Sequence, residues 1–374
     1  MSFPGPKPPR LWIPGPTHVR PEILAACARP TVGHRTQTMT DLVLALDPKL
    51  KRLFGTKQHV LVLTASGSAA WEGAVRCGVA RRWTCVTNGH FSETWARAGT
   101  DCGRETVRIE FPWGEGLEPQ RIADALRRAG PVEAVGFVHN ETSTGAYSDL
   151  PAIVAAIRSA QPDALLFVDA VSTLGGAPFQ FDEWGLDVAL ASSQKCLALP
   201  PGIAVVALSE RFVKKAPTIA GRGYYVDFVQ LVDDWEARNQ TPATPAVNLF
   251  YALEEQLTAM ERETYPKRFA RHREMADLFD RWATSKGFPS FVAEKFRSPT
   301  TANRATSKGG ANSASTFDVA TFIQKMLARG HELSNGYGKL KGLAFRVGHF
   351  GDHTVADLQA MLAVADEELR SMGR

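Results

Sequence analysis

The chain contains 374 residues, of which 44% are hydrophobic and 22% are charged, a composition typical of globular proteins. At roughly 100–200 residues per domain, this length predicts two domains. The 43 Lys and Arg residues outnumber the 39 Asp and Glu residues by only four and form no basic block. A surface dedicated to nucleic acid or to a membrane is therefore not expected.

The five cysteines are scattered and contain no C-x-x-C pair, so neither a disulfide framework nor a metal site is expected. This pattern favours a reducing, cytoplasmic location. The first residues lack the apolar segment of a signal peptide. No apolar run approaches the roughly 18 residues that span a bilayer.

The Pro- and Gly-rich start predicts an extended N-terminal arm over residues 1–20, because proline fixes φ and disfavours helix at the preceding residue. After the arm, apolar runs alternate with segments of helical periodicity. Apolar strands separated by helices predict an α/β fold with a mostly parallel sheet covered on both faces. The turn at Pro200-Pro201-Gly202 predicts that one strand runs antiparallel. We expect helices over 21–28, 39–54, 69–80 and 150–159, and strands over 59–64, 84–87, 134–139, 165–169, 188–192 and 203–209.

A long helical stretch over 247–286 leads into a C-terminal α+β unit. There we expect a polar surface loop over 298–315, a helix over 319–329, a strand over 343–347 and a helix over 354–372. We divide the chain into the arm at 1–20, a large domain at 21–255 and a small C-terminal domain at 256–374.

The segment Ser66-Gly67-Ser68 lies where a predicted strand ends and a helix begins. Backbone N–H groups and the positive end of a helix converge in such a segment, which favours a bound phosphate. An ordinary helix N-cap accounts for the same residues. The segment is not the G-x-G-x-x-G fingerprint, which counts against a nicotinamide cofactor.

An acid and a lysine follow two other apolar strands. Asp169 ends the strand over 165–169, at the edge where open parallel sheets bind ligands. Such an acid serves as a metal ligand, a base, a partner for a protonated ring nitrogen or a helix cap. Lys195 follows the strand over 188–192, and a desolvated lysine amine forms a Schiff base with an aldehyde, although a solvated lysine is commoner. Together with a phosphate site, these residues match what pyridoxal 5′-phosphate (PLP) requires.

The order of motifs resembles the class V aminotransferases of PLP fold type I, in particular the alanine–glyoxylate and serine–glyoxylate (serine–pyruvate) group. The resemblance extends over nearly the whole chain and implies a large domain with a mostly parallel seven-stranded sheet flanked by helices, followed by a smaller C-terminal α+β domain. It is carried by the stretches at 14–17 (PGPT), 33–35 (GHR), 66–68 (SGS), 88–89 (NG), 139–145 (HNETSTG), 168–169 (VD), 193–195 (SQK), 200–202 (PPG), 241–245 (TPATP) and 345–349 (FRVGH).

The resemblance also implies residue roles. Lys195 would form the Schiff base with the cofactor and carry the proton, and Asp169 would keep the pyridine nitrogen protonated. Arg346 resembles the arginine that binds the substrate carboxylate through two parallel hydrogen bonds. The remaining cofactor contacts implied are Ser66, Gly67, Ser68 and Gln194 at the phosphate, Phe91 over the ring, where several relatives have Trp, and Thr142 at the phenolic oxygen.

Thr241 and Thr244 resemble residues that reach the phosphate from the neighbouring subunit. The resemblance therefore implies a homodimer whose active sites are completed across the interface. A capped start of the helix near Val247 accounts for the same two residues without a dimer.

The implied reaction is a ping-pong transamination from a small amino acid, alanine or serine, to a 2-oxo acid, glyoxylate or pyruvate. A phosphoserine or aspartate aminotransferase, a PLP-dependent lyase or hydrolase, and a PLP-binding protein without turnover remain alternatives. A cysteine desulfurase is not expected, because no cysteine follows Cys196.

Substrate selectivity is not determined by these motifs. Arg35 and Arg222 are candidates for binding a second anionic group, and Tyr224 and Tyr225 are candidates for the substrate entrance. The loop over 334–338 is a further candidate for contact with the substrate side chain.

Overall fold

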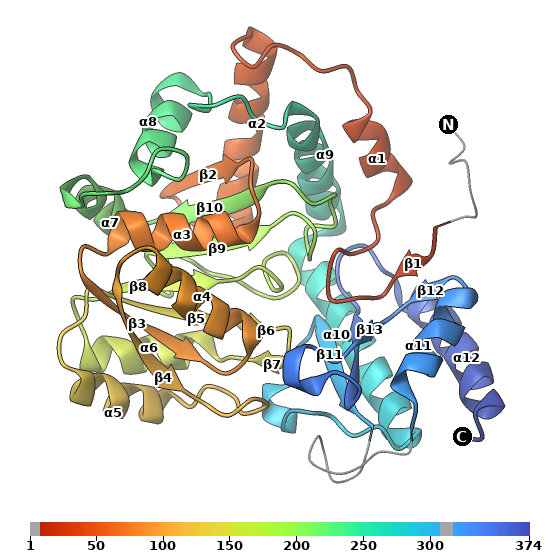
Figure 1. Ribbon diagram of the computed structural model, residues 1–374. Helices are drawn as coiled ribbons and strands as arrows, with labels where there is room; N and C mark the ends of the chain where they lie inside the picture. The colour runs from red at the N-terminus through yellow and green to blue at the C-terminus, as the bar shows by residue number, and fades with distance from the viewer. Residues whose placement is uncertain (1–7, 307–316) are drawn as a thin grey trace.

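The computed structural model describes residues 8–306 and 317–374. A seven-stranded sheet forms the centre of the larger part of the molecule (Figure 1). Strand β10 is antiparallel to both of its neighbours, and the other neighbouring strands are parallel. In spatial order the strands are β2 (His59–Leu63), β10 (Ala204–Leu208), β9 (Val188–Ser192), β8 (Leu165–Asp169), β5 (Ala134–Val138), β3 (Arg82–Thr87) and β4 (Glu105–Glu110).

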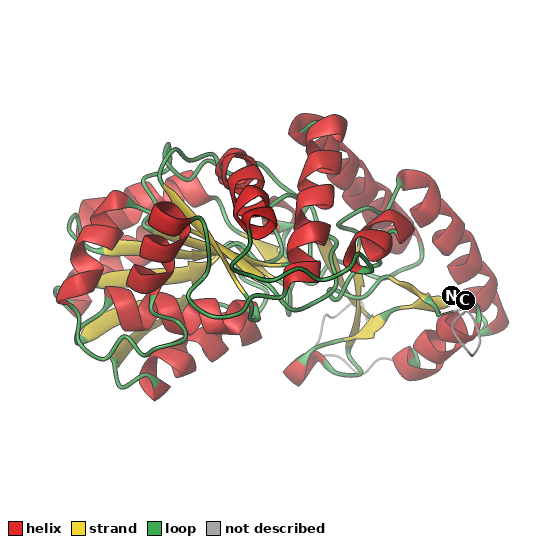
Figure 2. Ribbon diagram, turned by 90° about the horizontal axis from the view of Figure 1, so that it is seen from above, coloured by secondary structure: helices red, strands yellow, loops and turns green. Residues whose placement is uncertain are grey.

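Helices cover both faces of this sheet (Figure 2). Because both faces are covered, every residue of β5, β8, β9 and β10 is buried, as expected for strands with apolar side chains on both sides. The helices of this part are α1 (Pro21–Cys27), α2 (Gln37–Phe54), α3 (Gly67–Gly78), α4 (His90–Asp101), α5 (Pro119–Ala129), α6 (Leu150–Ala160), α7 (Glu210–Lys215), α8 (Phe228–Arg238) and α9 (Val247–Glu263).

The smaller part has a three-stranded sheet and a second hydrophobic core. Trp12 belongs to this core, and β1 (Arg10–Leu11) pairs with β12 (His331–Glu332). Residues 10–12 of the N-terminal arm therefore pack against the smaller part. The division at residue 255 remains a prediction. The elements of this part are α10 (Tyr265–Ser285), β11 (Thr301–Ala305), α11 (Val319–Ala328), β13 (Ser334–Asn335), β14 (Ala344–Gly348) and α12 (Val355–Ser371).

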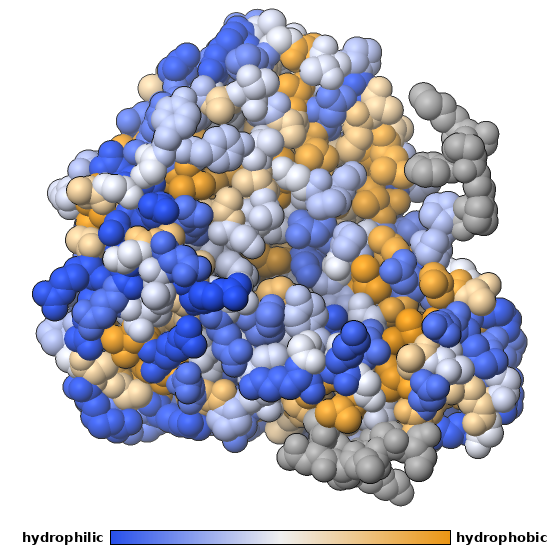
Figure 3. All heavy atoms as spheres, in the orientation of Figure 1, coloured by the Kyte–Doolittle hydropathy of each residue, from blue (hydrophilic) through white to orange (hydrophobic). Residues whose placement is uncertain are grey.

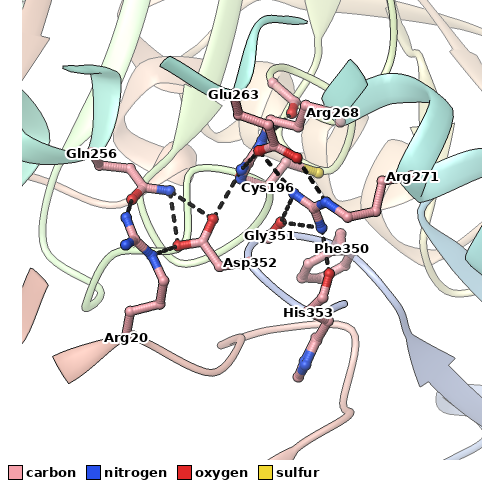
Figure 4. Close-up of polar contacts among 12 residues, drawn as sticks. Arg20, Cys196, Gln256, Glu263, Arg268, Arg271, Phe350, Gly351, Asp352 and His353 are labelled. Carbon is pink, nitrogen blue, oxygen red and sulfur yellow. Dashed lines mark hydrogen bonds and ion pairs between the residues drawn. The ribbon is translucent and has the colours of Figure 1, made fainter. Parts of the chain in front are cut away.

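A buried ion network joins the two parts (Figure 4). The Arg268 side chain is 1% exposed and forms ion pairs with Glu263 and Asp352. The same guanidinium donates hydrogen bonds to the carbonyl oxygens of Gly175 and Cys196. Arg268 therefore connects α10 to the segment that contains Lys195.

The structure confirms the predicted α/β class, the mostly parallel sheet and the antiparallel strand. The prediction of a surface loop over 298–315 is wrong for Thr301–Ala305, which forms β11 and is largely buried. Its polar side chains have partners far away in the sequence: Asn303 donates to the Ser143 carbonyl and Arg304 pairs with Asp280. Residues 307–316 of that loop lie outside the described residues.

The elements without a counterpart among the predictions include β4, α4, α5, α7 and α8. Strand β4 is an edge strand in which polar and charged residues separate the two apolar ones, so it has no apolar run. Among the described residues, none of the helices has the length and apolar character needed to cross a bilayer.

Candidate active site

Eight of the predicted site residues line one cavity of about 140 Å³ at the carboxyl ends of β8 and β9. This is the edge at which open α/β sheets bind ligands. The eight are Ser66, Gly67, Ser68, Phe91, Thr142, Asp169, Gln194 and Lys195; the cavity is also lined by Trp71, Val138, Asn140, Val171, Ser172 and Ser192.

The N-terminus of α3 forms one wall of the cavity. Ser66 holds the N-cap position, but its side chain makes no capping hydrogen bond to the described backbone. Ser66 and Ser68 are exposed, whereas Gly67 is buried. A Cβ atom on Gly67 would lie 2.4 Å from Ser192 Oγ, so only glycine fits there. Free hydroxyl groups and the unpaired N–H groups of a first helical turn suit a phosphate at this position.

Asp169 lies inside the cavity wall and is 3% exposed. Its carboxylate accepts hydrogen bonds from Trp71 Nε1 at 2.8 Å and from the Val171 backbone N–H at 2.7 Å. Burial outweighs these two donors and raises the pKa of Asp169 to about 7. A negative charge on Asp169 is therefore costly unless a cation faces it from the cavity. Trp71 was not among the predicted site residues.

Lys195 lies in the connection between β9 and β10, three residues beyond the end of β9. Its Nζ atom donates a hydrogen bond to the Pro14 carbonyl and lies 5.9 Å from the centre of the Phe91 ring. Burial, followed by the charge of Arg346, lowers the pKa of Lys195 to about 8. The neutral, nucleophilic form of the amine is thus far more populated near physiological pH than it is in an exposed lysine.

The N-terminal arm packs directly against this lysine. A Cβ atom on Gly15, which has a φ of +107°, would lie 2.5 Å from Lys195 Nζ. The Thr17 backbone N–H donates to the Gln194 carbonyl at 2.9 Å. The predicted site therefore lacked one segment, although the stretch at 14–17 was among the motifs that carried the resemblance.

Arg346 extends from β14 toward the turn that contains Thr142. Its Nη1 and Nε atoms donate to the carbonyl oxygens of Thr142 at 3.4 Å and Asn335 at 3.0 Å. Only 8% of Arg346 is exposed, and burial lowers its pKa to about 10. The guanidinium remains charged at neutral pH and is available to bind a carboxylate beside Lys195.

Asn140 adds a further polar group to the cavity. Its Nδ2 atom donates to Ser172 Oγ at 2.9 Å, while its buried Oδ1 atom has no partner among the described residues. An unpaired buried oxygen that lines a cavity fits a polar ligand. Sequence reasoning included Asn140 only within the motif at 139–145.

The remaining predicted residues lie elsewhere in the chain. Thr241 and Thr244 line a separate pocket together with Tyr224 and Tyr225. The Arg35 guanidinium donates to the carbonyl oxygens of residues 241 and 242, and Arg222 binds Asp227. None of these side chains lines the cavity that contains Lys195.

Comparison with known proteins identifies the family. Residues 22–332 match the model of the family described as aminotransferase class-V. The chain belongs to this family.

Two relatives align with nearly the whole chain. A serine–glyoxylate aminotransferase from Methylorubrum extorquens is 32% identical over 97% of this chain and 91% of its own length. An L-aspartate–glyoxylate aminotransferase from Paracoccus denitrificans is 30% identical over 97% of this chain and 91% of its own length. The crystal structure of an alanine–glyoxylate aminotransferase from Nostoc sp. superposes with a TM-score of 0.90 at 26% identity and covers 99% of this chain and 97% of its own. These findings confirm the predicted family, the PLP-dependent transferase fold and transaminase activity.

The family implies PLP as the cofactor, and the residues of the cavity fit it. The N-terminus of α3 suits the phosphate, and the buried Asp169 needs a cation such as a protonated pyridine nitrogen. Lys195 supplies an amine of lowered pKa for the aldehyde.

Proposed function

We propose that this class V enzyme is a PLP-dependent aminotransferase that moves an amino group from alanine or serine to glyoxylate or pyruvate by a ping-pong mechanism. The observation that carries the proposal is the position of Lys195 and Asp169 in one cavity, with the Arg346 guanidinium near enough for its charge to lower the pKa of Lys195. The names of the serine–glyoxylate and alanine–glyoxylate relatives support glyoxylate as an acceptor.

Bound PLP supplies an electron sink for the electrons released at the substrate Cα. Asp169 would hold the proton on the ring nitrogen, and the N–H groups at the start of α3 would bind the phosphate. Arg346 binds the α-carboxylate and so orients the substrate Cα. The Lys195 amine, partly neutral near pH 7, would remove the proton from the substrate Cα and would carry it to C4′, the aldehyde carbon of the cofactor.

The charges around the cavity favour a donor with a small uncharged side chain. A second carboxylate or a phosphate would need a cation besides Arg346. Within one chain, Arg35 and Arg222, the two candidates, are bound by backbone carbonyls and by Asp227 away from the cavity. Close to Arg346 lies the buried carboxylate of Glu141, which repels an acidic side chain.

We also propose that two chains form a homodimer with composite sites. Thr241 and Thr244 lie in a pocket of their own, which suits a role toward a neighbouring chain. Tyr224 is 75% exposed, and Leu24 is 51% exposed. Figure 3 shows apolar residues gathered on the surface over α1, the helix that carries Leu24. Large exposed apolar side chains are typical of a surface that another chain covers.

A donor–acceptor matrix with the purified PLP-bound enzyme tests the reaction. We expect alanine and serine to reduce the cofactor absorbance band in the half-reaction, and one 2-oxo acid to be consumed for each amino acid. Lys195→Ala should abolish both signals, whereas Lys295→Ala, which removes an exposed lysine paired with Glu118, should change neither. Loss of amino acid without consumption of an acceptor would favour a lyase and refute the proposal.

Mixing two inactive variants tests the composite site. Lys195→Ala supplies normal threonines, and the double variant Thr241→Val/Thr244→Val supplies a normal lysine. If each site takes its lysine from one chain and its threonines from the other, a mixed dimer has one intact site of two. Random reassociation makes about half of the dimers mixed, so about a quarter of wild-type activity should return. No recovery in dimers that have exchanged subunits would refute the composite arrangement.

A further inference from the structure

Tyr337 connects the two parts of the molecule beside the active site. It lies between β13 and the short helix η4 (Gly338–Leu340), in the loop that carries no role in the proposed mechanism. Its ring centre lies 4.5 Å from that of His90 and 5.5 Å from that of Phe91, at the start of α4 in the larger part. Distances of this size are those of aromatic rings in contact.

The same ring lies against the arginine that binds the substrate carboxylate. Arg346 Cζ is 5.0 Å from the Tyr337 ring centre, within the range of a cation–π contact. Tyr337 also contacts Phe91, whose ring centre is 5.9 Å from Lys195 Nζ. Tyr337 thus lies next to both groups that hold the donor: Arg346 directly and Lys195 through Phe91.

The backbone on either side of Tyr337 has little room to move. A Cβ atom on Gly336 would lie 1.9 Å from the Leu340 carbonyl oxygen, and one on Gly338 would lie 3.2 Å from the Trp113 ring. The Gly336 N–H donates to the Ala344 carbonyl at 2.7 Å. Trp113 in turn donates to Glu93 at 2.7 Å. The backbone that carries the Tyr337 ring is therefore held in place on both sides of this residue.

We propose that Tyr337 determines donor specificity by limiting the amino acid to a side chain no larger than that of serine. The inference rests on the proposed aminotransferase function and deepens it. An α-carboxylate on Arg346 and an amino group near Lys195 fix the substrate Cα between them. The side chain then extends toward the rings of Tyr337 and Phe91. A branched or aromatic group collides with these rings, and neither ring carries a positive charge that could bind an acidic group.

Donor competition measured on three variants tests this assignment. Tyr337→Ala removes the ring and should raise the ratio of kcat/KM for phenylalanine to that for alanine at least tenfold, since a change of even one methylene in an apolar pocket alters discrimination about 10–200-fold. Tyr337→Phe keeps the ring and should leave the ratio near the wild-type value. Leu327→Ala removes a side chain that is 44% exposed on α11 of the same part and serves as the control.

Binding without turnover gives a second readout. 3-Phenylpropionate and propionate carry the carboxylate but no amino group, so their dissociation constants for the PLP-bound enzyme report space alone. We expect Tyr337→Ala to lower the dissociation constant of 3-phenylpropionate relative to that of propionate by a similar factor. Tyr337→Phe should leave the ratio of the two constants unchanged.

An unchanged phenylalanine-to-alanine ratio in Tyr337→Ala, with alanine turnover retained, would overturn the inference and leave the proposed function intact. Absence of transamination by the wild-type enzyme with every donor would refute the proposed function and the inference together. Where Tyr337→Ala folds poorly, Tyr337→Leu provides the same comparison, because it keeps an apolar side chain of smaller volume.

Discussion

Replacing Gly15 by alanine would place a methyl group where the reactive amine lies. The added Cβ atom would be 2.5 Å from both Cδ and Nζ of Lys195 and 2.6 Å from Cε. Gly15 has a φ of +107°, a backbone conformation that alanine rarely adopts. Gly103 has a φ of +76°, and a Cβ atom added there would meet no atom of the described residues within 4 Å, so Gly103→Ala introduces backbone strain without the collision.

The two effects have different magnitudes and different readouts. Backbone strain costs on the order of 1–3 kcal/mol of folding free energy and is common to both variants. Carbon atoms in contact are about 3.5–4.0 Å apart, so the Lys195 side chain in Gly15→Ala must move by about 1 Å or more. A misplacement of that size costs about 100-fold in rate. We therefore expect kcat/KM to fall about 100-fold in Gly15→Ala and to stay near wild type in Gly103→Ala.

Steady-state transamination kinetics and denaturant unfolding of the two purified variants provide the measurement. The two variants should lose comparable folding free energy and should differ in kcat/KM. Equal activity of Gly15→Ala and Gly103→Ala would show that the arm does not restrict Lys195. A large loss of kcat/KM in Gly103→Ala as well would show that backbone strain alone lowers the activity.

Two further predictions concern charge. Arg346→Lys keeps the positive charge but loses the planar guanidinium group. Because hydrogen bonds to charged groups contribute about 1.5–3 kcal/mol, KM for the amino donor should rise about 10–100-fold. An unchanged KM would reject carboxylate binding by Arg346. Burial raises the pKa of Asp169 from 3.8 to about 7. In the cofactor-free enzyme, the contribution of Asp169 to stability is therefore present below about pH 4 and is lost as the pH rises to about 7. At 1.36 kcal/mol per pKa unit, this loss is on the order of 4 kcal/mol. The free energy of unfolding, measured with denaturant, should fall across this pH range and should fall less in Asp169→Asn; the same pH dependence in both proteins would contradict the assignment.

The residues that could be predicted from the sequence share a local structural context. Ser66, Asp169 and Lys195 each follow an apolar strand within a few residues, so the strand pattern alone brings them to one edge of the sheet. Strand β11 could not be recognised in this way. Asn303 and Arg304 make it appear to be a polar loop, and only the Ser143 carbonyl and Asp280, distant in sequence, reveal why these side chains are buried.

The groups that the strand pattern missed contact site residues from outside the large sheet. Gly15 approaches Lys195 from the N-terminal arm, and Tyr337 approaches Arg346 from a loop near the C-terminal end of the chain. Their positions depend on how the smaller part packs, not on any local periodicity. Because the cofactor chemistry lies on the strand ends and the space for the substrate side chain is bounded by these outer segments, enzymes of one family can keep the same reaction and accept different donors. This separation explains why the motif order identified the reaction and left the donor undetermined.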